Sequence, residues 1–300
     1  MNAVTGAFGY TGKYIARRLL EIGEPVITLT GHPDRPNQFD AAVKALPFRF
    51  DNPEAMAESL AGVRVLYNTY WVRFGRGDVT HERAVANSRA LIRAAVLAGV
   101  ERLVHVSIAN AGRAPHLPYY RGKALVEEEV RRAGIGYAIV RPTVIFSLED
   151  ILINNIAFLL RKAPVFVIPG SGSYRLQPVY VEDMARITVD AGHSGEDVTM
   201  DAVGPEIFSF EELVTTIART VGSRAVLLHG PPWLALTAAR VMGAVLGDVV
   251  LTREELEGLM ANLLVSDGPR TGSTHFSHWL AENGTKIGKR YASELKRHYA

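Results

Sequence analysis

Tyr119 and Lys123 are a tyrosine and a lysine four residues apart, a spacing suited to acid–base chemistry. On a helix, this spacing places both side chains on one face, about one turn apart. A free tyrosine has a pKa of about 10, too high for ready proton exchange at neutral pH. A neighbouring ammonium favours the phenolate and lowers that pKa. The pair therefore predicts a proton-exchanging site, and Pro118 just before it suits the start of the helix.

Ser107 is a third candidate for the same chemistry. It ends a strand predicted over residues 102–107, and sites in parallel sheets form at the carboxyl ends of strands. Its hydroxyl is therefore placed to hydrogen-bond a substrate carbonyl oxygen. His105 alternates with Val104 and Val106 in this strand, which favours a histidine satisfied within the sheet over a catalyst.

The elements that must position these residues alternate between strand and helix in the first half of the chain. Short β-branched runs predict strands over residues 1–5, 25–30, 63–69, 102–107 and 136–140. Runs with helical periodicity predict helices over residues 12–22, 53–60, 81–98 and 119–133. This alternation indicates βαβ units, so we expect an α/β fold, a doubly wound parallel sheet with helices on both faces.

Three glycines recur every third residue between the first predicted strand and the first predicted helix. In dinucleotide-binding sheets, this turn needs one glycine for its bend, one for close approach to the pyrophosphate and one for helix–strand packing. The N-terminus of the helix then faces the phosphates with unpaired N–H groups. The residues of this turn expected to contact a dinucleotide are Gly6, Phe8, Gly9, Tyr10, Thr11 and Gly12.

Thr5 completes a TGxxGxxG turn that resembles the short-chain dehydrogenase/reductase superfamily in its extended and atypical branches. Further matches cover most of the chain: Asn87, Ala98-Gly99-Val100, Tyr119-x-x-x-Lys123, Arg141-Pro142-Thr143 and Pro178-Val179-Tyr180-Val181-Glu182-Asp183. The overall similarity is greatest to atypical NAD(P)-binding members, which include NmrA-like regulators and the complex I accessory subunit. The set is specific for the superfamily, and implies its Rossmann sheet, but it does not single out one activity.

The resemblance implies a Ser–Tyr–Lys triad of Ser107, Tyr119 and Lys123. In that reading Tyr119 exchanges the hydroxyl proton during hydride transfer, Lys123 tunes it and holds the ribose, and Ser107 orients the oxygen. The motif spacing favours Tyr119 over the adjacent Tyr120. Further cofactor contacts are expected from Thr69, Tyr70, Pro142 and Thr143. Tyr70 and Trp71 follow the strand predicted over residues 63–69 and suit core or lid packing equally well.

The residues after the second predicted strand bear on the choice between NADP and NAD. An acidic residue there binds the ribose hydroxyls in NAD-binding sheets, whereas an arginine favours the 2′-phosphate. No carboxylate occupies that place here, and His32 and Arg35 lie within reach of a phosphate. We therefore expect NADP(H), and NAD stays an alternative because Asp34 follows closely. Asp51 matches a position that touches the adenine in relatives, or else it caps the helix before Pro53.

The alternation of strand and helix loosens after about Phe146. We expect a dinucleotide-binding Rossmann core over residues 1–146. Residues 147–300 form a mixed segment that returns strands to the core and builds a smaller, C-terminal substrate-binding lobe. Asn154 and Asn155 in an apolar helix of this segment face substrate or cap local backbone.

The composition of the 300-residue chain narrows the class of protein. The 33 basic and 31 acidic residues nearly cancel, so we expect a small-molecule substrate and no nucleic acid partner. The absence of cysteine excludes thiolate metal sites and fits a cytoplasmic location, and the nine histidines show no metal spacing. We expect no signal peptide, because the first apolar segment runs into the glycine turn.

Residues 233–251 are mostly apolar, but Arg240 and Asp248 leave a run too short to span a bilayer. We therefore expect no integral membrane segment. Gly243 and Gly247 are four residues apart and would let another backbone approach closely. This indicates a packed helix or a homodimer interface, with peripheral membrane contact as the alternative.

Two functions of different classes follow from these residues. The complete Ser–Tyr–Lys set favours an enzyme, an NAD(P)-dependent oxidoreductase or epimerase/dehydratase acting on a small or medium organic substrate. The alternative is a non-catalytic NADP(H)-binding regulatory or structural protein, like the NmrA-like and complex I relatives. The retained tyrosine discriminates between them, because many of those relatives lack it.

Overall fold

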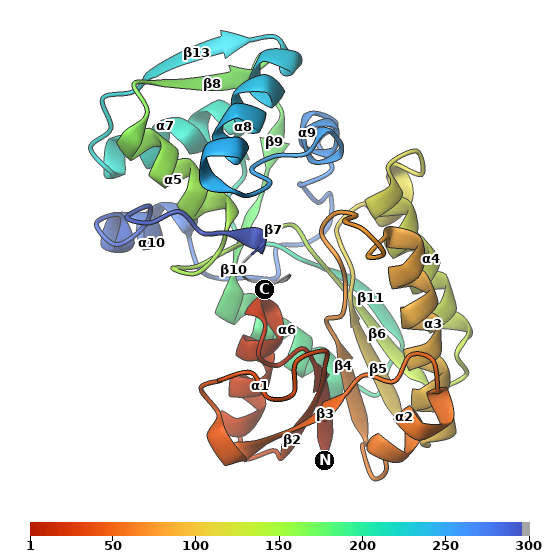
Figure 1. Ribbon diagram of the computed structural model, residues 1–300. Helices are drawn as coiled ribbons and strands as arrows, with labels where there is room; N and C mark the ends of the chain where they lie inside the picture. The colour runs from red at the N-terminus through yellow and green to blue at the C-terminus, as the bar shows by residue number, and fades with distance from the viewer. Residues whose placement is uncertain (296–300) are drawn as a thin grey trace. The chain divides into compact units, whose positions relative to one another are not determined.

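A seven-stranded sheet forms the centre of the first of two compact units in the computed structural model, which describes residues 1–295 (Figure 1). All neighbouring strands are parallel, and their spatial order is β3-β2-β1-β4-β5-β6-β11. The strands are β1 (Asn2–Thr5), β2 (Val26–Thr30), β3 (Val43–Pro47), β4 (Val65–Asn68), β5 (Arg102–Val106), β6 (Gly136–Pro142) and β11 (Val198–Ala202). The strand order reverses at β1, and ligands bind at this switch point in doubly wound sheets.

Helices cover both faces of this sheet, which confirms the predicted α/β, doubly wound class. On one face, α1 (Tyr10–Glu21) packs against α6 (Val181–His193). On the other face, α3 (His81–Leu97) packs between α2 (Pro53–Ser59) and α4 (Pro118–Arg132). The central strands β1, β2, β4 and β5 are therefore buried along their whole length, as expected of strands covered on both sides.

The first unit comprises residues 1–142 and 181–202. It ends four residues before the boundary expected after Phe146, and it regains α6 and β11 from the second half of the chain. Two short 3₁₀ helices, η1 (Asp40–Ala42) and η2 (Ala111–Arg113), lie in its connections. The helix expected over residues 12–22 starts earlier in the structure, at Tyr10, and Gly9 is its N-cap residue.

The second unit comprises residues 143–180 and 203–300, of which the structure describes those up to 295. Its strands form three two-stranded sheets, β7–β10, β9–β12 and β8–β13. The elements are β7 (Val144–Phe146), α5 (Leu152–Lys162), β8 (Val165–Pro169), β9 (Arg175–Leu176), β10 (Pro178–Tyr180), β12 (Phe208–Ser209), α7 (Phe210–Thr220), β13 (Val226–Gly230), α8 (Pro232–Leu246), α9 (Arg253–Met260) and α10 (Phe276–Asn283).

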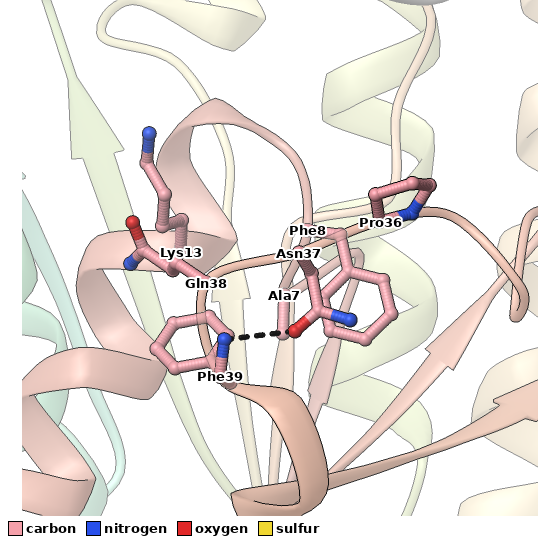
Figure 2. Close-up of a pocket in the computed structure, with 7 residues that line it drawn as sticks. All are labelled: Ala7, Phe8, Lys13, Pro36, Asn37, Gln38 and Phe39. Atoms are coloured by element: carbon pink, nitrogen blue, oxygen red, sulfur yellow. Dashed lines mark hydrogen bonds between the residues drawn. The ribbon is translucent and has the colours of Figure 1, made fainter.

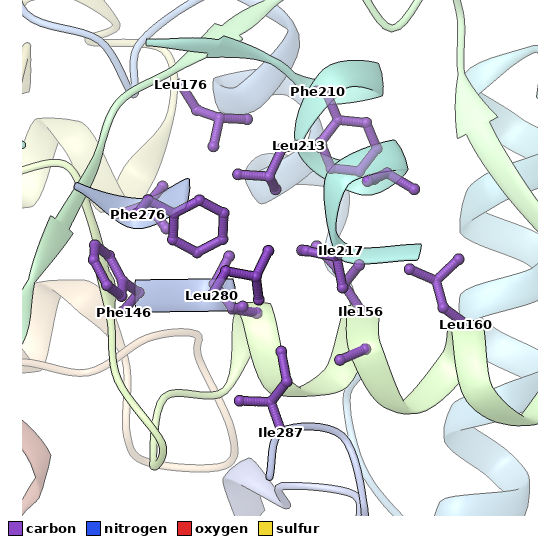
Figure 3. Packing of buried hydrophobic residues seen from close by; sticks show 14 of the residues in the cluster. Phe146, Ile156, Leu160, Leu176, Phe210, Leu213, Ile217, Phe276, Leu280 and Ile287 are labelled. Atoms are coloured by element: carbon purple, nitrogen blue, oxygen red, sulfur yellow. The ribbon is translucent and has the colours of Figure 1, made fainter. Parts of the chain in front are cut away.

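A separate hydrophobic core holds the second unit together. Leu213 and Ile217 of α7 meet Leu160 of α5 and Leu280 of α10 in this core (Figure 3). Helix α7 begins with a capping box, in which Ser209 and Glu212 satisfy each other's backbone N–H groups.

The two asparagines of α5 bind backbone. Asn154 binds local backbone, as one of the two expectations had it, whereas Asn155 binds backbone far along the chain. Asn155 donates to the Ala292 carbonyl at 3.0 Å and accepts from the Ala292 N–H at 2.8 Å. Asn154 donates to the Ser147 carbonyl at 3.2 Å.

Within residues 1–295, no helix is both long and apolar enough to cross a membrane.

Candidate functional site

The glycine turn between β1 and α1 has little room for side chains. Gly6 has a φ of +63°, which L side chains rarely adopt. A Cβ atom on Gly12 would lie 2.4 Å from the Gly6 carbonyl oxygen, so the helix packs directly on the turn. Gly9 is the N-cap of α1, and no side chain caps it. The start of the helix thus offers its first N–H groups to an anion, as a pyrophosphate site requires.

Thr5 joins this turn to the residues that follow β4. Its hydroxyl oxygen accepts hydrogen bonds from the N–H of Thr69 at 2.7 Å and of Tyr70 at 3.0 Å. The Thr69 hydroxyl donates to the Thr5 carbonyl oxygen at 2.6 Å. Thr69, an expected cofactor contact, therefore has a structural role in fixing the switch point of the sheet.

A pocket of about 420 Å³ opens between the glycine turn and the segment after β2 (Figure 2). Asn37 shapes this segment by accepting a hydrogen bond from the Phe39 N–H at 2.8 Å. Lys13, in the first turn of α1, brings a cation to the wall. The lining residues are Ala7, Phe8, Lys13, Pro36, Asn37, Gln38 and Phe39.

His32 and Arg35 precede this segment and are not among the residues that line the pocket. His32 is exposed, and its N–H donates to the Thr30 hydroxyl at 3.2 Å. Arg35 is half-buried, and its carbonyl accepts from the Asn37 side chain at 3.3 Å. Sequence reasoning searched only after β2 for a phosphate-binding cation and missed Lys13, whose place one turn beyond Gly9 was the available signal.

Asp51 is exposed in the turn before α2. The expectation that it caps this helix was wrong: the N-cap is Asn52, whose side-chain oxygen accepts from the Ala55 N–H at 3.0 Å. Asn52 directly precedes the proline that opens the helix, and its oxygen reaches the N3 residue. A contact of Asp51 with adenine stays a prediction.

Lys123 lies buried on α4, and its ammonium donates to the Val106 carbonyl at 2.8 Å at the end of β5. The same ammonium lies 4.7 Å from the centre of the Trp71 ring. Burial lowers the pKa of Lys123 from 10.5 to about 7, and the nearby Glu127 carboxylate opposes that effect. The lysine can therefore exist in both protonation states near neutral pH.

Tyr119 is half-buried one turn before Lys123 and is surrounded by aromatic rings. Trp71 and His81 both meet it edge to face, with ring centres 6.0 Å and 5.7 Å away. Trp71 and His81 stack on each other at 6.0 Å. Gly122 makes room for this group, because a Cβ atom there would lie 2.8 Å from the Trp71 ring. Tyr120, the alternative tyrosine, is buried.

Ser107 is buried, and its hydroxyl donates to Glu127 at 2.6 Å. Arg141 of β6 donates to the same carboxylate oxygen at 2.8 Å, and Arg131 donates to the other oxygen at 3.0 Å. Burial alone would raise the pKa of Glu127, but these hydrogen bonds bring it below its ordinary value. The hydrogen bond that Ser107 was expected to donate to a substrate oxygen is donated instead to the carboxylate of Glu127, which sequence reasoning missed.

Three further residues expected to contact the cofactor also have protein partners. Tyr70 packs against Phe48 and Phe50, and its hydroxyl accepts from the Asn87 amide at 2.7 Å. The carbonyl of Pro142, at the end of β6, accepts from the Ala109 N–H at 2.9 Å. In the second unit, the buried Thr143 hydroxyl donates to the carbonyl of Gln177.

His105 is a sheet residue, as predicted, but it is only partly satisfied there, because its Nε2 is buried with no hydrogen-bond partner within residues 1–295. It is fully buried, and its Nδ1 lies 3.2 Å from the Asn68 side chain. Burial, with Lys123 as the second cause, holds the pKa of His105 well below its usual range. Within residues 1–295, no group of three or more histidines and acidic residues is arranged to hold a metal ion.

Comparison with known proteins finds a domain family and several relatives that this chain is similar to. Residues 6–151 match the NAD(P)H-binding domain family. The chain is 27% identical over 286 residues to NADH dehydrogenase [ubiquinone] 1 alpha subcomplex subunit 9 of Arabidopsis thaliana, which covers 88% of this chain and 70% of that protein. The match to the corresponding mouse protein covers only 59% of that protein. It is also 26% identical over 247 residues to a ceramide reductase of Caulobacter vibrioides, covering 81% of this chain and 77% of the reductase.

Solved structures share the fold at low sequence identity. An NADPH-dependent quinone oxidoreductase of Escherichia coli, complexed with NADPH, covers 95% of this chain and 99% of its own, with a TM-score of 0.75 and 19% identity. A nucleoside-diphosphate-sugar epimerase of Staphylococcus aureus covers 99% of both chains, with a TM-score of 0.71 and 17% identity. These findings agree with the resemblance to the extended, NmrA-type branch of the short-chain dehydrogenase superfamily that the motifs of this chain indicate.

Proposed function

We propose that this protein is an NADP(H)-dependent oxidoreductase in which Tyr119 and Lys123 move the proton that accompanies hydride transfer to an organic substrate. The observation that carries the proposal is the buried Lys123 ammonium, one helical turn from Tyr119 and at the carboxyl end of β5. A buried cation is costly unless it has a task or a partner. Such groups with shifted pKa values gather at functional sites.

The residues of the first unit fit a dinucleotide. Gly12 lets α1 pack directly on the glycine turn, and the helix start at Gly9, which no side chain caps, suits a pyrophosphate. The indole N–H of Trp71 is buried with no hydrogen-bond partner within residues 1–295, which leaves a donor for a polar ligand. Lys13 in the pocket wall favours the additional phosphate of NADP(H). When bound, the cofactor supplies the hydride.

Tyr119 and Lys123 supply the proton chemistry in this proposal. Tyr119 gives its proton to the substrate oxygen or takes it back, and a charged Lys123 stabilises the phenolate that forms. The aromatic rings of Trp71 and His81 exclude water from the Tyr119 ring. These walls suit a substrate with little charge, such as a ketone or quinone, better than a diphosphate.

Replacement of Tyr119 tests the proposal. We expect Tyr119→Phe to lower NADPH turnover at least about a hundredfold, because the proton donor is lost, while NADPH affinity changes little. Oxidation of NADPH with ketones, quinones and sugar nucleotides is followed by absorbance, and affinity by fluorescence titration. Tyr120→Phe, on the neighbouring buried residue, is the matched control and should retain turnover. Near-normal turnover of Tyr119→Phe would remove Tyr119 from this role.

A second function, as a non-catalytic NADP(H)-binding structural or regulatory protein, has its own support. The Ser107 hydroxyl is held by Glu127, and Lys123 donates to Val106 beneath the Trp71 ring. Both groups would have to change partners before they could act on a substrate. The similarity to a complex I subunit points the same way. Tight NADPH binding without oxidation by any substrate of the panel would favour this function over the first.

A further inference from the structure

Helix α8 and the sheet beneath it expose an unusual amount of apolar side chain in the second unit. Trp233, Val241 and Val245 of α8 are 64%, 63% and 77% exposed. The adjoining strands add Val165 at 41%, Val226 at 56% and Leu228 at 49%. We call the following residues the α8 surface: Val165, Val226, Leu228, Trp233, Leu234, Val241 and Val245.

The strand register makes these residues one continuous surface. Val226 pairs with Val165 in the parallel β8–β13 sheet, and Leu228 and Gly230 follow on the same face because side chains alternate. A Cβ atom on Gly230 would lie 3.0 Å from the Leu234 side chain, so α8 begins on that face (Figure 1). Leu227 and His229 point to the opposite face, where Leu227 packs on the core and His229 pairs with Glu211.

The glycines of α8 do not form a seam for another helix. Gly243 is buried, and a Cβ atom on it would lie 2.6 Å from the Asp248 carbonyl oxygen of the same chain. Gly247 ends the helix with a φ of +64°. At Gly243 the close approach is therefore made by the chain's own turn, and Gly247 serves to end the helix, so neither glycine requires a partner helix.

The stretch of sequence that forms β13 and α8 carries no acidic residue. From Leu213 to Gly247 the sequence contains no aspartate or glutamate. Arg224 and Arg240 are exposed, and no ion pair is described for either within residues 1–295. Thr237, on the exposed side of α8, donates its hydroxyl to the Trp233 carbonyl at 2.8 Å and so presents mainly its methyl group.

We propose that the α8 surface docks on an anionic lipid membrane, with α8 lying in the plane of the headgroups. An apolar helix face bordered by arginines, with a tryptophan at its end, is the pattern of helices that bind membrane interfaces. The charge complementarity favours acidic phospholipid, because each basic residue near such a surface adds attraction. A second copy of the chain would instead bring two arginine-bordered faces together.

Vesicle binding by the full-length protein tests this docking. Flotation is measured with vesicles of phosphatidylcholine alone and of phosphatidylcholine with about 30% phosphatidylglycerol. We expect at least about fivefold more protein on the acidic vesicles, and release as the ionic strength rises to about 0.5 M, where surface charges are screened. Brominated lipid should quench the fluorescence of Trp233 in the wild-type protein, and Trp233→Phe should lose that quenching.

Two variants with equal added charge separate docking from a general charge effect. Val241→Asp with Val245→Asp should reduce binding to the level on phosphatidylcholine. Val96→Asp with Leu97→Asp, at exposed positions of α3 in the first unit, should leave most binding in place. Equal binding by both double variants, no binding to acidic vesicles, or a dimer in light scattering that only the α8 variant disrupts would overturn the proposal. NADPH affinity and turnover are expected to be the same in both variants.

Discussion

The charge on Lys123 links the site to stability at the scale of a single residue. Its pKa is lowered from 10.5 to about 7, chiefly by burial. Between these pH values the unfolded chain binds a proton that the folded chain does not, so the free energy of unfolding rises with pH. The cost of burying the charge is complete below pH 7 and is gone above about 10.5. The slope is on the order of 1 kcal/mol per pH unit.

Lys123→Met removes this titration and keeps a similar length of apolar side chain. We expect the wild type to gain stability relative to the variant as the pH rises from 7 to 10, and the variant to be the more stable of the two near pH 7. Urea unfolding at several pH values measures the difference. A difference that does not change with pH would mean that the folded lysine keeps an ordinary pKa.

The tyrosine and lysine could be found from the sequence because their spacing is a local property of one helix. Glu127 lies a further turn along the same face, and that spacing was an available signal. Its hydrogen bonds with Ser107 and Arg141 could not be predicted, because they depend on how α4 lies across β5 and β6. The spacing of residues within one helix does not show which side chains of distant segments will bind to them.

At the scale of an element, the packing of α1 on the glycine turn controls access to the dinucleotide. Gly12→Ala places a Cβ atom 2.4 Å from the Gly6 carbonyl oxygen, closer than real contacts allow. The start of α1 must shift, so we expect NADPH affinity to fall at least about tenfold, or about 1.4 kcal/mol. Fluorescence titration measures it. Gly195→Ala, before the start of β11, is the control, since a Cβ atom there meets nothing within 4 Å, and equal affinities for the two variants would contradict the expectation.

The strands and helices of the first unit were largely predictable because each has a strong periodic pattern. Their ends were less so: Gly9, without a side chain, starts α1 two residues early, and Asn52 rather than Asp51 caps α2. Both differences arise from which backbone N–H groups a neighbouring oxygen can reach. In the second unit, strands as short as β9 and β12 pair over more than thirty residues of sequence, and short strands carry no readable pattern.

At the scale of the whole molecule, the two units have separate cores, and the glycine turn, the pocket and Lys123 belong to the first. A mild change in the second core should therefore reduce stability without altering cofactor affinity. Ile217 is fully buried in α7, and Ile217→Val typically costs about 1 kcal/mol.

We expect the urea midpoint of Ile217→Val to fall while its NADPH dissociation constant stays within about twofold of wild type. Gly12→Ala provides the opposite case, since its main effect is on the dissociation constant. A tenfold weaker dissociation constant in Ile217→Val would show that the second unit shapes the cofactor site, and Thr143, at the start of that unit, would then be the first residue to test. The Thr143 hydroxyl donates to the carbonyl of Gln177. If that hydroxyl changes partner when NADPH binds, Thr143→Val should then weaken NADPH binding as Ile217→Val would. If the hydroxyl keeps its partner, NADPH affinity should not change.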